Sequence, residues 1–165
     1  MEEKKNIMDY DTVSLDDENS AVVIIDQTKL PGTTEIIALK TAQEIWDAIY
    51  LLQVRGAPAI GVTGGYAYYV LADQIETEDK HEFIRKCTEM MEYINSSRPT
   101  AVNLSWALNR MHDVMLNEIH NMSIPELKVR LMEEADAIRQ DGRRHPVGQA
   151  AAFGNGGKGE DAYRH

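Results

Sequence analysis

Two arginines stand directly before predicted helix starts, where a cation and a helix end could together bind an anion. Arg55 opens the run Arg-Gly-Ala-Pro-Ala-Ile-Gly, and Arg98 opens the run Arg-Pro-Thr-Ala-Val-Asn-Leu. In each run a proline falls in the first turn of the expected helix and keeps the residue before it extended. The free N–H groups and the dipole of a helix start then add to the guanidinium charge, a combination that suits phosphate.

Gly56 and Ala57 follow Arg55, and side chains this small let a ligand come close to the backbone. The candidate phosphate site predicted from the residues therefore consists of Arg55, Gly56, Ala57 and Arg98. The competing interpretation is a pair of ordinary helix junctions with solvated arginines. The residue pattern alone leaves both interpretations open.

The other reactive residue types form no comparable pattern. The five histidines have no metal-ligand spacing, so we predict no metal site. Cys87, the single cysteine, occupies an apolar position of a predicted helix and is expected to be a buried structural thiol. Asp26 lies at the end of a predicted strand, where it could hold a turn or orient Arg55.

The hydrophobic pattern predicts the elements that must position these residues. Apolar, β-branched stretches bounded by turn residues indicate short strands over residues 12–15, 21–25 and 35–39. Apolar residues at helical spacing predict helices that begin at Thr41, Pro58, Asp79, Pro99 and Ser123. The helix over residues 58–72 is apolar nearly all round and should form the centre of the core. The predicted fold class is α+β, with a small N-terminal antiparallel sheet of two or three strands followed by a bundle of about five helices.

Composition narrows the class of protein. The chain has 165 residues, 43% of them hydrophobic and 27% charged, as in an ordinary globular protein. The formal net charge of -10 argues against binding to nucleic acid. The longest uncharged run, residues 56–72, contains four glycines and is predicted to be a buried helix rather than a membrane span. The charged N-terminus and the single cysteine favour a cytoplasmic protein without a signal peptide.

The sequence changes character near residue 140. We therefore predict an N-terminal domain over residues 1–140 and a separate tail over residues 141–165. The tail has no leucine, isoleucine or methionine and holds six of the eleven glycines. Such a segment cannot bury enough apolar surface to fold by itself, so the tail is expected to be disordered or derived from a frameshift.

Three stretches of the sequence carry a family resemblance: residues 26–31, 54–61 and 97–104. They include Val-Arg-Gly-Ala-Pro-Ala-Ile-Gly and Arg-Pro-Thr-Ala-Val-Asn-Leu and are similar to the motifs of methylthioribose-1-phosphate isomerase, in the initiation-factor-2B-like isomerase superfamily. The stretches occur in the family's order and at similar spacing. The resemblance covers about residues 10–138, which correspond to the N-terminal domain of a typical member.

The resemblance implies a sugar-phosphate isomerase of methionine salvage, which converts the aldose 5-methylthioribose 1-phosphate to the ketose 5-methylthioribulose 1-phosphate. It assigns substrate binding to Arg55, Gly56, Ala57 and Arg98, and it implies neither a metal nor an organic cofactor. The family's catalytic cysteine and aspartate lie in a C-terminal Rossmann-like domain, so this chain is expected to hold no catalytic residue and to be an inactive fragment. Family members commonly form homodimers, and no nucleic-acid or membrane partner is expected.

Two related functions stay open. The same superfamily contains regulatory subunits of a translation initiation factor exchange complex, which bind ligands or partners without isomerising them. It also contains a ribose-1,5-bisphosphate isomerase. The joint presence of both arginine motifs favours the methylthioribose-1-phosphate branch. Because the second domain is absent, the helices are expected to expose an apolar face and the chain to self-associate.

Overall fold

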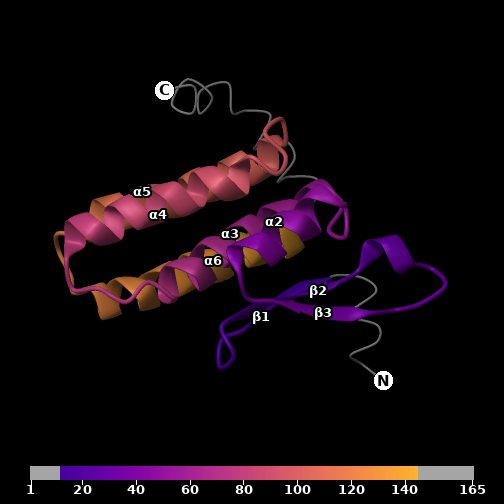
Figure 1. Cartoon of the computed structure of the whole chain (residues 1–165), viewed down its shortest axis with the longest axis horizontal. Helices are drawn as coiled ribbons and strands as arrows, with labels where there is room; N and C mark the ends of the chain where they lie inside the picture. Colours follow the sequence, from indigo (N-terminus) through magenta and orange to yellow (C-terminus); the bar gives the residue numbers. More distant parts are fainter. Residues whose placement is uncertain (1–11, 145–165) are drawn as a thin grey trace.

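The computed structural model of the chain describes residues 12–144. A three-stranded antiparallel sheet, in the order β1-β2-β3, lies against one side of a bundle of helices (Figure 1). The strands are β1 (Val13–Asp16), β2 (Ala21–Ile25) and β3 (Ile36–Leu39). The predicted α+β class is therefore confirmed, and each strand starts within one residue of its predicted start.

Helix α3 forms the centre of the molecule. Within the described residues the α-helices are α2 (Ala42–Tyr50), α3 (Ala57–Asp73), α4 (Lys80–Asn95), α5 (Val102–Glu118) and α6 (Ile124–Arg144). A short 3-10 helix, η1 (Gln27–Lys29), lies between β2 and β3. Helix α3 contacts the other four α-helices and strands β1 and β2. Every residue from Ile60 to Ala72 is buried, which confirms the prediction of a central helix.

The last helix crosses the domain boundary that composition suggested. Helix α6 runs to Arg144, so the first four residues of the predicted tail are helical. The remainder of that tail, residues 145–165, lies outside the described residues, and its disorder and frameshift origin stay predictions. None of the helices described is long and apolar enough to cross a membrane.

Two helices begin with the capping boxes that the sequence predicts. At the start of α2, Thr41 Oγ1 accepts a hydrogen bond from the Glu44 N–H, and Glu44 Oε1 accepts one from the Thr41 N–H. At the start of α6, Ser123 and Glu126 exchange the same pair of hydrogen bonds. Each box satisfies two backbone donors that a helix start otherwise leaves free.

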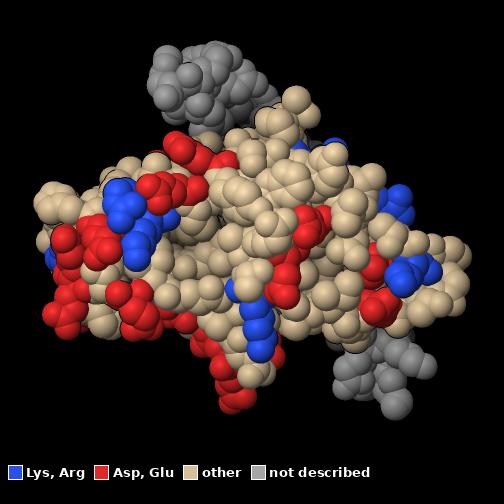
Figure 2. All heavy atoms as spheres, in the orientation of Figure 1, with Lys and Arg blue, Asp and Glu red and all other residues tan. Residues whose placement is uncertain are grey.

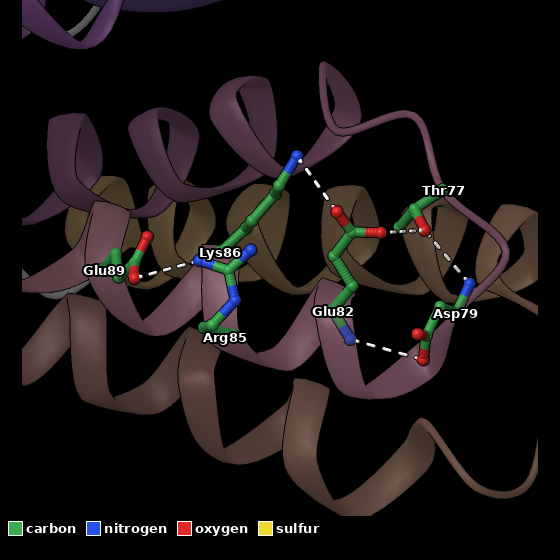
Figure 3. A network of polar contacts seen from close by, with 6 residues as sticks. All are labelled: Thr77, Asp79, Glu82, Arg85, Lys86 and Glu89. Carbon is green, nitrogen blue, oxygen red and sulfur yellow. Dashed lines mark hydrogen bonds and ion pairs between the residues drawn. The ribbon is translucent and has the colours of Figure 1, made fainter.

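Helix α4 also begins with side chains that satisfy its first N–H groups (Figure 3). Asp79 Oδ1 accepts hydrogen bonds from the backbone N–H groups of His81 and Glu82, at 2.9 and 3.4 Å, and Figure 3 shows the bond from Glu82. The Glu82 carboxylate accepts a hydrogen bond from the Thr77 hydroxyl and lies 3.5 Å from Lys86 Nζ. The hydrogen bond from Thr77, followed by the charge of Lys86, lowers the pKa of Glu82. The first N–H groups of α4 therefore already have a side-chain acceptor.

The prediction that a helix begins at Pro99 is wrong, because α5 begins at Val102. Residues 98–101 form a turn in which the Ala101 N–H donates to the Arg98 carbonyl at 2.9 Å. Pro99 takes the second position of this turn, where its fixed φ angle fits. Arg98 therefore lies in the turn that precedes α5. Arg55, by contrast, directly precedes Gly56, the N-cap of α3.

On the face drawn in Figure 2, acidic side chains gather at two places. They gather at the end of the bundle where α4 and α6 begin, which includes the acidic loop over residues 76–79. They also gather at the tip of the β1–β2 hairpin, over residues 16–18. Helices α3 and α5 begin at the opposite end of the bundle (Figure 1).

Several large apolar side chains are exposed close to the starts of α3 and α5. Tyr50, Leu51 and Leu52 follow one another at the end of α2 and are 58%, 57% and 40% exposed. Val102, at the start of α5, is 62% exposed. This surface agrees with the expected exposure of apolar residues, and self-association of the chain stays a prediction.

Cys87 is fully buried on α4, which confirms the prediction of a structural thiol. Burial raises the pKa of the Cys87 thiol to about 12. Because the thiolate is the reactive form of cysteine, this raised pKa disfavours reaction of Cys87 at neutral pH.

A polar network around the half-buried His112 joins α3, α4 and α5. Tyr68 Oη lies 2.8 Å from His112 Nδ1, and Thr88 Oγ1 lies 3.5 Å from His112 Nε2. Thr88 donates its single hydroxyl hydrogen to the Ile84 carbonyl, so it can only accept from His112 Nε2–H. Nδ1 is then the acceptor for the Tyr68 hydroxyl, whose pKa is raised well above its ordinary value by burial. The network therefore uses neutral His112.

We expect the free energy of unfolding to decrease when His112 becomes protonated. Burial lowers the pKa of His112, although the charges of Asp113 and Glu92 oppose this shift. The unfolded chain then binds a proton at a higher pH than the folded chain, so stability decreases as the pH falls below about 6.5. Urea unfolding at about pH 7.5 and about pH 5.5 measures this decrease.

The matched variants are His112→Asn and His120→Asn. An asparagine at position 112 keeps an acceptor for the Tyr68 hydroxyl but takes up no proton, so the decrease in stability should become smaller. His120 is exposed, so its replacement should leave the decrease unchanged. An unchanged decrease in His112→Asn would show that another group titrates.

Candidate functional site

The two motif arginines line one surface pocket at the end of the bundle where α3 and α5 begin (Figure 1). Its volume of about 440 Å³ lies within the range of small-molecule sites. All four residues of the predicted phosphate site line the pocket: Arg55, Gly56, Ala57 and Arg98. The other lining residues are Leu52, Ile60, Ala101, Val102 and Asn103. The structure brings the predicted residues together, and their role in substrate binding stays a prediction.

The helices that begin at the pocket differ from α2, α4 and α6, because no described side chain caps them. The N-cap of α3 is Gly56 and the N-cap of α5 is Ala101, and neither position makes a side-chain hydrogen bond to the helix. The first N–H groups of both helices are therefore left for water or a ligand. Two helix starts, each with partial positive charge, favour an anion in the pocket.

Neither pocket arginine forms an ion pair with a carboxylate of the described part of the chain. On α4, by contrast, Arg85 Nη1 lies 3.1 Å from a carboxylate oxygen of Glu89 (Figure 3). The guanidinium groups of Arg55 and Arg98 are therefore available to a ligand. Guanidinium groups bind phosphate through paired, charge-assisted hydrogen bonds.

Gly56 is required by the conformation of the backbone and not by lack of space. Its φ angle is 91°, a conformation that L-residues with a side chain rarely adopt. A Cβ atom built on Gly56 would meet nothing within 4 Å. Leu52, in the same connection from α2 to α3, also has a positive φ angle, of 64°. Because Leu52 has a side chain, its backbone is strained there, as is that of Ser20 in the β1–β2 turn, where φ is 54°.

Arg55 is held by a polar scaffold around Asp26. Arg55 Nη2 donates to the Gln27 carbonyl at 3.4 Å, and the Gln27 N–H donates to the Gln53 carbonyl at 2.9 Å. The buried Asp26 carboxylate accepts hydrogen bonds from the N–H and the hydroxyl of Thr28 and from Gln53 Nε2. Asp26 therefore holds the turn after β2, which is one of its two predicted roles. Through the described contacts it acts on Arg55 by way of Gln27 and Gln53.

We expect Asp26→Asn to lower the free energy of unfolding by about 1–3 kcal/mol, the cost of losing a hydrogen bond to a charged group. Burial raises the pKa of Asp26, but the hydrogen bonds from Thr28 and Gln53 outweigh burial and leave the pKa below its ordinary value. The carboxamide replaces one accepting oxygen with a donor that faces other donors. Urea unfolding measures the change. The exposed Asp113→Asn is the control and should change stability by less than about 0.5 kcal/mol.

Comparison with known proteins connects this pocket to a family. Residues 53–152 match the Initiation factor 2 subunit family. This chain belongs to the Initiation factor 2 subunit family. The matched segment contains both arginine motifs, residues 54–61 and 97–104, whereas the first stretch of the resemblance, residues 26–31, lies outside it.

The relatives of this chain include several isomerases. Methylthioribose-1-phosphate isomerase from Parabacteroides distasonis is 52% identical over 120 residues, which are 73% of this chain and 36% of that protein. Methylthioribose-1-phosphate isomerase from Symbiobacterium thermophilum is 44% identical over 132 residues, or 80% of this chain and 36% of that protein. 5-Deoxyribose 1-phosphate isomerase from Bacillus cereus is 40% identical over 134 residues, or 81% and 38%. The chain spans little more than a third of the length of these relatives.

Solved structures that share the fold of this chain include an isomerase and an initiation factor subunit. 5-Methylthioribose 1-phosphate isomerase from Pyrococcus horikoshii superposes with a TM-score of 0.71 at 34% identity, over 77% of this chain and 35% of that chain. The delta subunit of translation initiation factor eIF-2B from A. fulgidus superposes with a TM-score of 0.69 at 32% identity, over 78% and 36%. The resemblance stated from the motifs is confirmed, and the fold by itself does not separate the enzyme from the initiation factor subunit.

The pocket contains one polar residue that the sequence analysis did not select. Its polar lining side chains are Arg55, Arg98 and Asn103. Asn103 lies in the second motif, five residues after Arg98, and that position is the signal that could have identified it. Among the described residues, no group of three or more His, Cys, Asp or Glu could hold a metal ion.

Proposed function

We propose that this chain is the N-terminal, substrate-binding part of an isomerase that converts 5-methylthioribose 1-phosphate to 5-methylthioribulose 1-phosphate in methionine salvage. The observation that carries the proposal is the meeting of Arg55, Arg98 and two uncapped helix starts at one pocket. Guanidinium groups and helix-end N–H groups are suitable donors for a phosphate ester. The identity of the sugar is supported by the names of relatives at 52% and 44% identity.

The shape of the pocket supports a ligand larger than phosphate alone. Its 440 Å³ leave room beside the guanidinium groups, and Leu52, Ile60 and Val102 supply apolar walls. An apolar substituent such as the methylthio group suits such walls, because burial removes its surface from water. We therefore place the phosphate between the two arginines and the methylthio end against the apolar walls.

We further propose that these 165 residues bind the substrate without converting it. Conversion of an aldose to a ketose moves hydrogen between two neighbouring carbons and needs groups that give and take protons. No described Asp, Glu, His or Cys lines the pocket. The family resemblance assigns the catalytic cysteine and aspartate to a second, Rossmann-like domain. A homodimer follows from the same resemblance, and a cytoplasmic location follows from the charged N-terminus and the single cysteine; both belong to this proposal.

The purified chain is expected to form no 5-methylthioribulose 1-phosphate from 5-methylthioribose 1-phosphate, because its pocket lacks an acid or a base. Phosphorus NMR of the incubated mixture distinguishes the two sugar phosphates. A chain that binds the aldose and leaves it unchanged supports the proposal. Product formed well above the rate in a protein-free control would contradict the proposed inactivity.

A regulatory initiation-factor-2B-like module is the second candidate function, and its support is the similarity to the delta subunit from A. fulgidus. The related substrates are 5-deoxyribose 1-phosphate, supported by the B. cereus relative, and ribose 1,5-bisphosphate. Titration of the chain with all three sugar phosphates separates these possibilities. Tightest binding of 5-methylthioribose 1-phosphate supports the first choice. Tighter binding of another sugar would change the substrate, and binding of none would favour the regulatory module.

A further inference from the structure

Asn103 has a buried amide donor without a partner, at the wall of the pocket. Asn103 is one of the lining residues, and it is only 9% exposed. Its Nδ2 atom is buried and has no hydrogen-bond partner among the described residues. Asn103 is the second residue of α5, so it lies in the uncapped first turn of that helix.

The close approach of two helices explains why this side chain is buried. A Cβ atom built on Gly61 of α3 would lie 3.7 Å from the Asn103 carbonyl oxygen and 3.9 Å from Asn103 Cβ. Asn103 therefore lies against the first turns of α3, beside the helix start that Gly56 leaves uncapped. A half-turn of its terminal carboxamide exchanges the nitrogen and the oxygen without a change of shape. In the structure the nitrogen is shielded from the pocket, and this half-turn brings the donor to the pocket without movement of the backbone.

An unpaired buried donor destabilises the folded chain, and native proteins rarely retain one without a reason. Leucine has a similar size and would remove the unpaired donor. No described group therefore fixes the Asn103 amide by accepting a hydrogen bond from its nitrogen. The amide is free to turn toward a ligand in the pocket, and this availability is an observation independent of the arginines.

The chemistry of the amide indicates which part of the ligand it contacts. Of the three polar side chains that line the pocket, Arg55 and Arg98 carry the charge that matches phosphate, and Asn103 is the uncharged one. Neutral amide donors match the hydroxyl and ring oxygens of a sugar. We propose that Asn103 recognises the sugar, by donating a hydrogen bond from its amide to a sugar oxygen of the bound phosphorylated pentose. This inference rests on the proposed function of the pocket.

The test compares two ligands and two substitutions in the full 165-residue chain. The variants are Asn103→Leu and Asn103→Ala, and the ligands are 5-methylthioribose 1-phosphate and inorganic phosphate, each titrated by NMR. We expect both variants to bind the sugar phosphate about fivefold to tenfold more weakly, the effect of one lost hydrogen bond. Binding of inorganic phosphate should stay within about twofold, because the arginines remain. Asn109→Leu on the same helix is the matched control and should bind both ligands as the parent does.

A structural role for Asn103 predicts a different result. If the side chain only fills space, Asn103→Leu should bind both ligands as the parent does, and that outcome would overturn the inference alone. Equal weakening for the sugar phosphate and for inorganic phosphate would also overturn it, because the amide would then contact the phosphate. A parent chain that binds neither ligand would overturn the proposed function together with this inference. Asn103→Ala introduces no larger side chain and keeps the test valid if Asn103→Leu unfolds.

Discussion

Replacement of both Arg55 and Arg98 by alanine is expected to abolish measurable binding of 5-methylthioribose 1-phosphate. The parent chain should bind this ligand in the millimolar range, which corresponds to about 4 kcal/mol. A hydrogen bond to a charged group contributes about 1.5–3 kcal/mol, so loss of both guanidinium groups weakens binding by about 100-fold or more. The dissociation constant of the double variant then lies beyond the reach of a titration.

NMR titration of the parent and the double variant measures this loss, and two further variants make it specific. Arg85→Ala removes one positive charge from α4 but does not touch the pocket, so its binding should equal that of the parent (Figure 3). Arg98→Ala alone should weaken binding by about tenfold or more. Superimposable curves for the parent and the double variant would show that the pocket does not hold phosphate, and the proposed function would fail.

Gly64→Val is expected to lower the free energy of unfolding by about 3 kcal/mol, as overpacking of a tight core does. Gly64 lies in the buried middle of α3, where α5 crosses it closely. A Cβ atom at this position would lie 3.1 Å from Leu104 Cδ1 and 3.3 Å from Ala107 Cβ. Valine adds two methyl groups beyond that Cβ, so α3 and α5 have to move apart. Urea unfolding measures the loss.

Gly32→Val is the matched control for this substitution. Gly32 is exposed between η1 and β3, and a Cβ atom there would meet only the Lys29 carbonyl oxygen, at 3.8 Å. Its replacement should change stability by less than about 1 kcal/mol. If Gly64→Val proved no more destabilising than Gly32→Val, the close packing of α3 on α5 would be refuted.

The sequence predicts the elements well where one local pattern decides the structure. The capping boxes at Thr41 and Ser123 determine two helix starts through contacts within four residues. The apolar run after Pro58 predicts a buried helix, because any other placement would expose it to water. The strands are predicted within one residue, since turn residues bound each of them.

The sequence predicts less well where a residue has two suitable local structures. Proline fits the first turn of a helix and also the second position of a β-turn, because both fix a similar φ angle. Pro58 takes the first structure and Pro99 takes the second. The choice at Pro99 depends on the Arg98–Ala101 hydrogen bond and on the packing of α5, and a one-dimensional pattern contains neither.

The candidate site shows the same division between local and long-range information. Arg55 and Arg98 could be selected from the sequence because each precedes a predicted helix start, although α5 begins at Val102 and not at Pro99. The contact between Asp26 and Gln53 joins residues that are 27 positions apart, so periodicity gives no sign of it. Asn103 resembles a surface residue in the sequence, and only the close approach of α3 and α5 buries its amide.

Because α3 is central to the fold, we expect a ligand bound in the pocket to raise the temperature at which the domain unfolds. Within residues 12–144, the helix that contacts the other four α-helices is also the helix whose first turn forms the pocket wall. A compound that binds only the folded chain raises its stability by about 1.4 kcal/mol at ten times its dissociation constant. Heat denaturation can therefore be used to screen small anions for binding. The anion that raises the melting temperature most at a given concentration is the one that binds the folded chain most tightly.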